Sequence, residues 1–408
     1  MNELTSLGII AEYNPFHTGH AYHITQSRLL TGADCVIVIM SGNFLQRGEP
    51  AIVDKYTRAK MALCNGADLV IELPVVSSTS SAQYFAKGSI AILNALGVNH
   101  LSFGSESGDI APMLSFVNFL NENEKLLDEK IKELTATGIS YPLARNKAAN
   151  ALADTKQDNL LNKPNNILGI EYLIELQKSA SSITPHTIKR LGNDYNDSTL
   201  SDSFCSASSI RRSIFATGNI PAYALPENVL NILKDYEKDH PFIHLDDFTL
   251  PLKIKLLEMK HKKTCNEDIT DVTNIADLPP YLLNKLFHAM DCCNTITQLI
   301  ETVKSKDLTY ARINRALTHI LLNITDDDYT EFQKNPCPYI RILGLNDTGA
   351  AFLSTRKKTL SCPIITKPAD YREYIHRDIF ASDIYNMVAN QKGKKPLIND
   401  YQHKIIKL

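Results

Sequence analysis

Short apolar runs alternate with segments of helical periodicity over the first 105 residues. Four runs are continuously apolar, which is typical of strands buried on both faces; they cover residues 6–13, 34–42, 67–74 and 99–105. Three intervening segments have helical spacing and end near a glycine, which favours a left-handed C-cap; they cover residues 18–32, 54–66 and 82–96. This alternation predicts an α/β fold with a doubly wound parallel sheet. Ligands bind such sheets at the carboxyl ends of the strands, near the point where the strand order reverses.

Helical patterning continues beyond the fourth strand. Three more helices are predicted, at residues 110–136, 142–155 and 165–180, and another strand is predicted at 184–191. A serine-rich polar stretch at 192–209 then leads into a predicted helix at 210–218.

The texture of the sequence changes at about residue 220, where prolines become frequent. The remainder is predicted to be mostly helical, with short strands at 338–345 and 360–366. We therefore predict an α/β domain over residues 1–220 and a mostly α-helical region over residues 221–408.

Bulk composition narrows the function only slightly. The formal net charge is −2, so a binding site for a polyanion has to be a local patch. The eight cysteines include no C-x-x-C pair and predict neither a zinc site nor a disulfide framework. No run reaches about 18 apolar residues, and the N-terminus lacks a basic region followed by an apolar leader segment. We therefore expect a cytoplasmic enzyme or binding protein that does not enter a membrane.

The first motif that carries chemistry is EYNPFHTGHAYHI at residues 12–24, directly after the first predicted strand. His20 falls in the first turn of the next helix, where free backbone N–H groups and the helix dipole favour an anion. Gly19 lets a ligand approach the backbone, and the imidazoles of His17 and His20 suit charge that grows on an α-phosphate during nucleotidyl transfer. With 12 His and 17 Gly in 408 residues, His-x-Gly-His arises by chance only about 0.015 times per chain. The alternative is one capping and one packed histidine, and His23 is expected to be a packing residue.

Other polar residues follow the remaining strands. Arg47 and Lys55 come after the second strand and are candidates for binding an acidic substrate or the end of an RNA. Gly104 ends the fourth strand, where a base or ribose can pass close to a residue without Cβ. Ser208 and Arg211, at the start of a predicted helix, are candidates for binding phosphate groups. The structural alternatives are a solvated loop, a turn glycine, and a plain N-cap with surface arginines.

The HTGH sequence after an apolar strand resembles the HxGH nucleotidyltransferase superfamily, which includes class I aminoacyl-tRNA synthetases and pantetheine-phosphate adenylyltransferase. Within it, the chain resembles the bacterial tRNA(Met) cytidine acetate ligases in a set of motifs that spans residues 8–173, namely GIIAEYNPFHTGH, MSGNFLQRGEPAIVDKYTRAKMAL, GADLVIELP, FGSE and PNNILGIEYL. Looser similarity continues in TYARINRAL (309–317), RILGLNDTG (341–349) and ASDIY (381–385).

The resemblance implies a ligase that uses ATP to activate acetate as acetyl-adenylate and then acetylates N4 of the wobble cytidine of elongator tRNA(Met). It implies a nucleotidyltransferase-like catalytic domain over 1–220 and a tRNA-binding region over 221–408, with Mg²⁺ expected beside the ATP phosphates. No metal ligand in the chain and no obligate protein partner is inferred.

Site residues carry over from the family motifs position by position. His17 and His20 are the implied catalytic residues. The implied ATP-binding residues are Leu7, Gly8, Ile9, Ile10, Ala11, Glu12, Tyr13, Asn14, Pro15, Phe16, His17, Thr18, Gly19, His20, Gly104, Asn165 and Arg190. Ser208 and Arg211 match in part a Ser/Thr-Ser-x-x-Arg element that holds ATP phosphates in the superfamily.

Two other functions stay open on the sequence. A small-molecule adenylyltransferase of the coenzyme type would share the histidine motif but has little use for residues 221–408. A non-catalytic RNA-binding protein with a relic nucleotide fold is disfavoured by the intact His-x-Gly-His. Basic clusters suited to RNA phosphates include Arg312 with Arg315 and the lysines between 253 and 263, although any one cluster is more often a solvated face.

Overall fold

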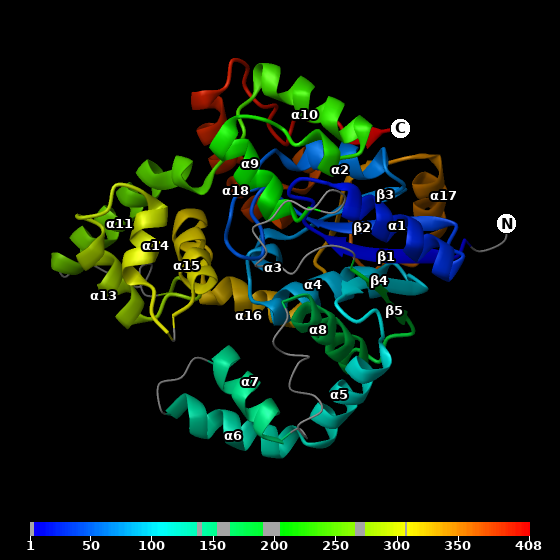
Figure 1. Ribbon diagram of the computed structural model, residues 1–408, viewed down its shortest axis with the longest axis horizontal. Helices are drawn as coiled ribbons and strands as arrows, with labels where there is room; N and C mark the ends of the chain where they lie inside the picture. Colours follow the sequence, from blue (N-terminus) through cyan, green and yellow to red (C-terminus); the bar gives the residue numbers. More distant parts are fainter. Residues whose placement is uncertain (1–3, 137–140, 153–163, 191–204, 266–273, 307) are drawn as a thin grey trace.

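The computed structural model describes residues 4–136, 141–152, 164–190, 205–265, 274–306 and 308–408. Eight strands in this part of the chain form one mixed sheet in the order β5-β4-β1-β2-β3-β6-β7, with β8 paired to β6 (Figure 1). The strands are β1 (Ser6–Ala11), β2 (Cys35–Ser41), β3 (Leu69–Leu73), β4 (His100–Ser105), β5 (Thr184–Lys189), β6 (Ile340–Leu345), β7 (Ile364–Ile365) and β8 (Ile406–Lys407).

Five of the strands form the parallel sheet expected from the sequence. β1 pairs with β2 and β4, β2 with β3, and β4 with β5, all in parallel. The order runs from β1 through β2 to β3 and then returns to β4 on the other side of β1, so the switch point lies between β1 and β4. β6 is antiparallel to β3, and β7 and β8 pair in parallel with β6. The predicted doubly wound α/β sheet is confirmed, and three strands of reversed direction extend it.

Helices cover both faces of the sheet because successive strand residues point to opposite sides. One face, which includes Ile37 and Phe103, shares a core with α4 (Ala82–Ala95), α5 (Ala111–Glu122) and α8 (Pro164–Lys178). The other face, which includes Ile9 and Val38, shares a core with α1 (Thr18–Thr31), α2 (Lys55–Leu63), α9 (Ala207–Thr217) and α10 (Glu227–Asp239). Burial on both sides explains why the strands are continuously apolar in the sequence.

Two sequence predictions need correction. The segment 110–136 contains two helices, α5 and α6 (Glu124–Ala136), instead of one. Asn123 separates them, and its side-chain amide donates to the Phe119 carbonyl (2.9 Å), a local bond that competes with helical pairing. The strand expected at 360–366 is reduced to the two residues of β7. Figure 1 shows α6 and α7 (Tyr141–Leu152) projecting together from the body of the molecule.

The remaining helical segments lie mostly in the C-terminal part. They are α3 (Val75–Ser78), η1 (Ala222–Ala224), η2 (Leu245–Phe248), α11 (Thr249–Thr264), α13 (Pro280–Ala289), α14 (Ile296–Val303), α15 (Tyr310–Leu322), α16 (Asp326–Lys334), α17 (Asp347–Arg356), η3 (Pro368–Tyr371) and α18 (Arg372–Lys392). Helices α11, α13, α14, α15 and α18 share a core that also contains Phe44 and Val75. The division at residue 220 stays a prediction, and both sides of it contribute to the sheet and to this core. No described helix is long and apolar enough to cross a membrane.

Candidate active site

The turn between β1 and α1 carries the two histidines of the HTGH motif. Tyr13 has a positive φ of 50°, and the peptide bond between Asn14 and Pro15 is cis. The Asn14 side-chain oxygen accepts a hydrogen bond from the backbone N–H of Ile52 (2.7 Å), which ties the turn to the segment before α2. Tyr13 and Phe16 flank the cis Asn14–Pro15 bond in the chain, and both side chains are buried. The turn therefore places His17 at the N-terminus of α1, next to the switch point of the sheet.

His17 and His20 form a capping box made of two imidazoles. Nδ1 of His17 accepts the backbone N–H of Gly19 (3.0 Å), and Nδ1 of His20 accepts the backbone N–H of His17 (3.3 Å). The rings stack with centroids 3.7 Å apart. Because each Nδ1 accepts a hydrogen, each neutral ring carries its proton on Nε2. The cap thus leaves both histidines with an Nε2–H that can donate to a ligand.

Both imidazoles are neutral at pH 7. Burial, followed by the nearby Arg190 guanidinium, lowers the pKa of His17 to about 3. Burial and then the His17 ring lower the pKa of His20 well below 6.5. The pair can therefore stabilise negative charge by hydrogen-bond donation from fixed neutral groups, which is how an oxyanion site acts.

Gly104, Asn165 and Arg190 come together beside the histidines, at the carboxyl ends of β4 and β5. A Cβ on Gly104 would lie 3.1 Å from Cγ of Arg190, so the glycine makes room for the arginine side chain. Arg190 donates to the Asn165 side-chain oxygen (3.1 Å), and the Asn165 amide nitrogen donates to Oε1 of Glu106 (3.0 Å). This chain of bonds fixes the orientation of the Asn165 amide and places a cation next to the imidazoles.

Several buried polar atoms around the turn have no hydrogen-bond partner among the described residues. They are the Tyr13 hydroxyl, the Asn14 side-chain nitrogen, the Thr18 hydroxyl and Oε2 of Glu106. Buried polar groups are nearly always paired in folded proteins, so unpaired donors and acceptors gathered at one strand end are consistent with a polar ligand. Three of the four lie between β1 and the first turn of α1, within the stretch carried over for ATP.

Glu12 lies at the end of β1, on the side of the turn that faces the loop after β2. Its Oε1 accepts the backbone N–H of Gln46 (2.8 Å). The Arg47 charge is close enough to lower the pKa of this carboxyl, although burial has the larger, raising effect. Arg47 thus lies near the turn as expected, and the side chain of Glu12 acquires a defined position.

Arg211 reaches the same turn from α9. It donates to the Asn14 carbonyl (2.9 Å) and forms an ion pair with Glu49 (3.0 Å). Ser206 caps α9 by accepting the N–H of Ser209 (3.2 Å), and Ser208 lies half-buried in the first turn. The structure therefore brings Arg211 to the histidine turn. The polar residues 192–204 before it lie outside the described residues.

Lys55 is not directed at the histidine turn, which corrects the expectation from its position after β2. Its side chain is 0% exposed, and Nζ donates to Glu72 (2.8 Å), Asp400 (2.7 Å) and Ser382 (3.0 Å). An ammonium group has three hydrogens to donate, and all three are used within the protein. Lys55 belongs to a buried ionic network that also includes Arg341, paired with Asp400 at 2.9 Å.

The basic clusters considered for RNA are partly neutralised. Lys260 pairs with Asp291 (2.9 Å), and Arg315 pairs with Asp277 (3.1 Å).

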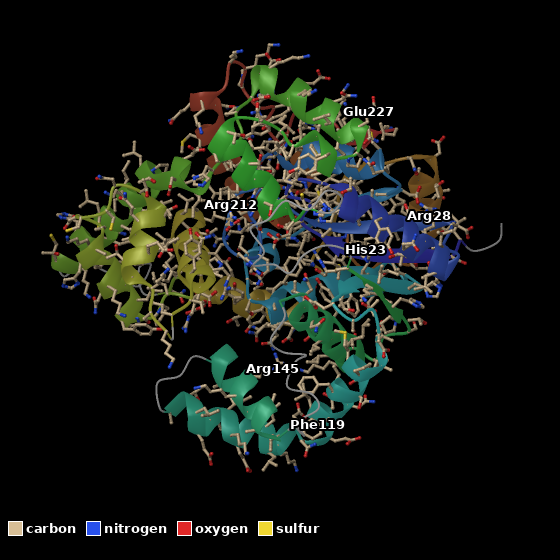
Figure 2. The ribbon with its side chains drawn as sticks, in the orientation of Figure 1. His23, Arg28, Phe119, Arg145, Arg212 and Glu227 are labelled. Carbon is tan, nitrogen blue, oxygen red and sulfur yellow. The ribbon has the colours of Figure 1, made fainter. Side chains whose placement is uncertain are left out.

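His23 (Figure 2) contacts the Ser102 hydroxyl of β4 through Nε2 at 3.2 Å. Sequence reasoning quoted FGSE but did not single out Glu106, whose link to Asn165 depends on two segments about 60 residues apart in the chain.

Comparison with known proteins identifies similar chains over the full length. A family model described as HIGH Nucleotidyl Transferase matches residues 4–399. The tRNA(Met) cytidine acetate ligase of Clostridium tetani is 39% identical over 96% of this chain and 99% of that protein. The tRNA(Met) cytidine acetate ligase of Thermoanaerobacter sp. is 41% identical over 98% of this chain and 99% of that protein.

Two solved structures of Thermotoga maritima TmcAL superpose on the whole chain. The apo form has a TM-score of 0.90 at 30% identity, and the match covers 99% of this chain and 100% of the T. maritima chain. The form bound with alpha-thio ATP has a TM-score of 0.88 at the same identity and coverage.

Proposed function

The chain belongs to the HIGH nucleotidyl transferase family and to the tRNA(Met) cytidine acetate ligases, and from this premise we propose how it carries out an ATP-dependent ligase reaction. It activates acetate as acetyl-adenylate and transfers the acetyl group to N4 of the wobble cytidine of elongator tRNA(Met). The binding of alpha-thio ATP by the T. maritima relative supports ATP as the nucleotide. We propose a cytoplasmic location, which a tRNA substrate supports.

The first half-reaction is an in-line displacement at the α-phosphate. A carboxylate oxygen of acetate forms a bond to the α-phosphorus while pyrophosphate leaves. Negative charge grows on the α-phosphate oxygens, where Nε2–H of His17 and of His20 donate hydrogen bonds. Arg190, held by Asn165, adds a positive charge on the nucleotide side. Each such donor is worth about 10²–10³ in rate when it is preorganised in a site that excludes water.

Mg²⁺ is expected to enter with ATP, on its β- and γ-phosphates, and would neutralise charge there. Within the described residues no group of three or more His, Cys, Asp or Glu gathers as a metal site. The residues present therefore do not form a protein cage for the ion, and we assign it no protein ligand.

The second half-reaction transfers the acetyl group. The cytidine N4 attacks the acetyl carbonyl carbon, and AMP leaves. Residues 221–408, which pack on the catalytic part through a shared core, hold the anticodon arm in this proposal. Arg211, which reaches the histidine turn from α9, contributes to binding the phosphate groups together with Ser208.

The single observation that carries the proposal is the imidazole capping box at the switch point. Two neutral Nε2–H donors, a nearby guanidinium and unpaired polar atoms meet where doubly wound sheets bind nucleotides. A structural capping box also uses two side chains, as His244 and Asp247 do at η2. The box at α1 differs because both of its members keep an Nε2–H beside a guanidinium and unpaired polar atoms.

Two measurements test the proposal. The purified protein should exchange labelled pyrophosphate into ATP only when acetate is added. Nucleosides from tRNA incubated with protein, ATP and labelled acetate should contain labelled N4-acetylcytidine by mass analysis. Omission of acetate is the control for the first assay, and tRNA with the wobble cytidine replaced by uridine is the control for the second. Absence of exchange would exclude the adenylate mechanism, whereas exchange without acetylated tRNA would favour a small-molecule adenylyltransferase.

A further inference from the structure

The two proposed half-reactions differ in their proton balance. Acetate, an ionised carboxylate at neutral pH, attacks phosphorus without losing a proton. The exocyclic amine of cytidine must lose one proton as it becomes an amide. The site therefore needs one proton acceptor, and only for the second step. This need for a proton acceptor rests on the proposed function.

The groups that bind the nucleotide are poor candidates for that acceptor. The basic nitrogen of His17 and of His20 is already used, because each Nδ1 accepts a backbone N–H. Burial also lowers the pKa of both rings far below neutrality. Arg190 and Asn165 have no basic lone pair to offer at neutral pH. Glu49 is held in an ion pair with Arg211 (3.0 Å). Two other carboxylates of the site remain among the described residues, Glu12 and Glu106.

Glu106 belongs to the nucleotide side of the site. Its Oε1 accepts from Asn165, which in turn accepts from Arg190. The carboxylate is thus coupled to the cation that approaches the phosphate. A group in this position holds and orients the nucleotide machinery, and its hydrogen bonds within the described residues are with Asn165 and Asn166 of α8.

Glu12 lies on the other side of the turn and is held in place from two directions. Arg58 of α2 donates to its backbone carbonyl (2.7 Å), and the backbone N–H of Gln46 donates to Oε1 (2.8 Å). Its second carboxylate oxygen, Oε2, has no hydrogen bond to any described residue. One oxygen is therefore anchored, while the other is available to a substrate.

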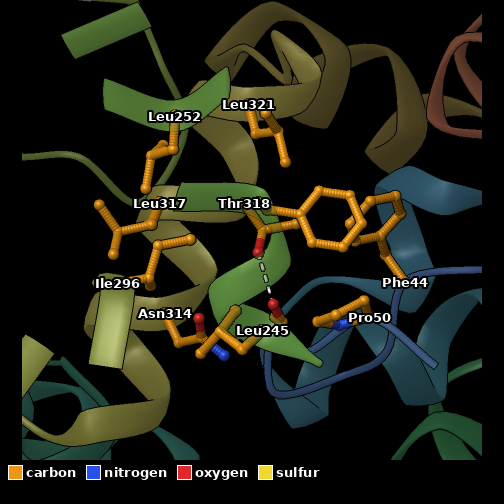
Figure 3. A pocket seen from close by; sticks show the side chains of 11 residues that line it. Phe44, Pro50, Leu245, Leu252, Ile296, Asn314, Leu317, Thr318 and Leu321 are labelled. Atoms are coloured by element: carbon orange, nitrogen blue, oxygen red, sulfur yellow. Dashed lines mark hydrogen bonds between the residues drawn. The ribbon is translucent and has the colours of Figure 1, made fainter. Parts of the chain in front are cut away.

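The loop that anchors Glu12 also contacts the helical region. Gly48 packs on α15 with a positive φ of 75°, and a Cβ there would lie 2.7 Å from the backbone of Asn314. The Asn314 amide donates to the Arg47 carbonyl (2.9 Å). The Thr318 hydroxyl donates to the Gly48 carbonyl (2.6 Å), the bond drawn as a dashed line in Figure 3. Glu12 thus occupies the junction between the nucleotide turn and the region proposed to hold tRNA.

We propose that Glu12 is the general base of acetyl transfer. The N4 lone pair forms a bond to the acetyl carbonyl carbon, and the carbon–oxygen bond to AMP breaks with its electron pair on the leaving phosphate. One N4 proton passes to Oε2 of Glu12. The neutral carboxylic acid then returns the proton to solvent when the products leave.

The electrostatics around Glu12 fit this role. Burial raises its pKa, against the lowering effects of the Gln46 N–H and the Arg47 charge. A carboxylate with a raised pKa is a better base near neutral pH. The charged or titratable groups that face it are Arg47 and Glu49 of the loop, Arg58 of α2, Arg211 of α9 and Tyr172 of α8.

The test separates the two half-reactions. Glu12→Gln keeps an oxygen for the Gln46 N–H and removes only the basic group. Single-turnover transfer from enzyme-bound acetyl-adenylate to tRNA should fall by about 10²–10⁴-fold, the usual range for a lost general base. The ratio of transfer rate to acetate-dependent pyrophosphate exchange should fall by at least ~10². Glu12→Asp, which keeps a carboxylate, should transfer faster than Glu12→Gln.

Glu106→Gln is the matched comparison, since it removes the other carboxylate of the site. It should lower exchange and transfer together and leave their ratio within a few fold of the wild-type ratio. Wild-type transfer should rise with pH as Glu12 ionises, and Glu12→Gln should lose that rise. Glu12→Gln with wild-type transfer, or with exchange and transfer reduced in parallel, would overturn the role given to Glu12. A wild-type protein that neither exchanges nor acetylates would instead overturn the proposed function itself.

Discussion

His17 combines a structural and a chemical role, and one substitution separates them. Its Nδ1 caps α1 by accepting an N–H, and its Nε2–H faces the proposed phosphate site. Asparagine is among the best N-cap residues, and its side-chain oxygen can take over the accepted hydrogen bond. His17→Asn should therefore keep the cap and remove the donor, whereas His17→Ala should remove both.

The expected magnitudes follow from the two contacts. Loss of an N-cap costs about 0.5–2 kcal/mol of stability, so only His17→Ala should show this decrease at pH 7. Loss of one preorganised donor costs about 10²–10³ in rate, so both variants should lose acetate-dependent pyrophosphate exchange by that factor. The two variants should thus differ in stability but agree in activity.

The pH dependence of stability provides a further check on the buried state of His17. Its native pKa of about 3 is depressed below 6.5, so its contribution is present above pH 6.5 and is lost as the pH falls. From pH 7 to pH 5 this loss amounts to about 2 kcal/mol for one histidine. Urea unfolding at both pH values should show that His17→Asn loses about 2 kcal/mol less than the wild type.

These measurements can refute the reasoning in two ways. Exchange by His17→Asn within about threefold of wild type would show that Nε2–H does not act on the transition state. An equal loss of stability in His17→Asn and wild type between pH 7 and pH 5 would show that the native imidazole is not held neutral. A stable but inactive His17→Asn is the expected result.

Three further predictions concern packing around the site. Gly104→Ala places a Cβ 3.1 Å from Cγ of Arg190, so kcat/KM for ATP in the exchange assay should fall about tenfold; an unchanged value would separate Arg190 from ATP binding. Asp400→Asn leaves the fully buried Lys55 without one of its two carboxylate partners. It should lower the free energy of unfolding in urea by about 3–5 kcal/mol. A decrease below about 1 kcal/mol would mean that the network is dispensable for stability. Gly48→Ala adds a Cβ at φ +75°, against the α15 backbone. It should cost about 1–2 kcal/mol of stability and lower Tm by about 1–2 °C; an unchanged Tm would show that the loop gives way.

Local sequence patterns predicted the elements whose burial can be read from their own residues, namely the first four strands and the helices between them. The apolar runs at 6–13, 34–42, 67–74 and 99–105 contain β1 to β4, because strands of a sheet covered on both faces must be apolar throughout. The glycine that ends the first helical pattern, Gly32, is a left-handed C-cap with φ 63°. The histidine motif is recognisable for the same reason, since its position directly after the first apolar run and the rarity of His-x-Gly-His are both local features.

Contacts between distant segments account for what the sequence did not show. Lys55 looked available because a lysine after a strand usually reaches solvent, yet its partner Asp400 lies 345 positions away. Gly104, Asn165 and Arg190 came from family resemblance, because no spacing rule links the ends of β4, α8 and β5. The sequence also did not show that β6 runs antiparallel to β3, because a short apolar strand does not reveal its pairing partner.

The buried network around Lys55 bears on why one chain carries both half-reactions. Acetyl-adenylate is a mixed anhydride, so it must stay away from water until the cytidine arrives. Asp400 and Arg341 of the C-terminal part give Lys55 and Glu72, which already pair with each other, a second charged partner each. Loss of one partner from such a buried network costs several kcal/mol. The loop before α2 likewise joins Glu12 to α15 through Gly48 and the Asn314 amide. The proposed tRNA-binding region is therefore joined to the catalytic part by buried ion pairs and backbone contacts, which fix its position relative to Glu12.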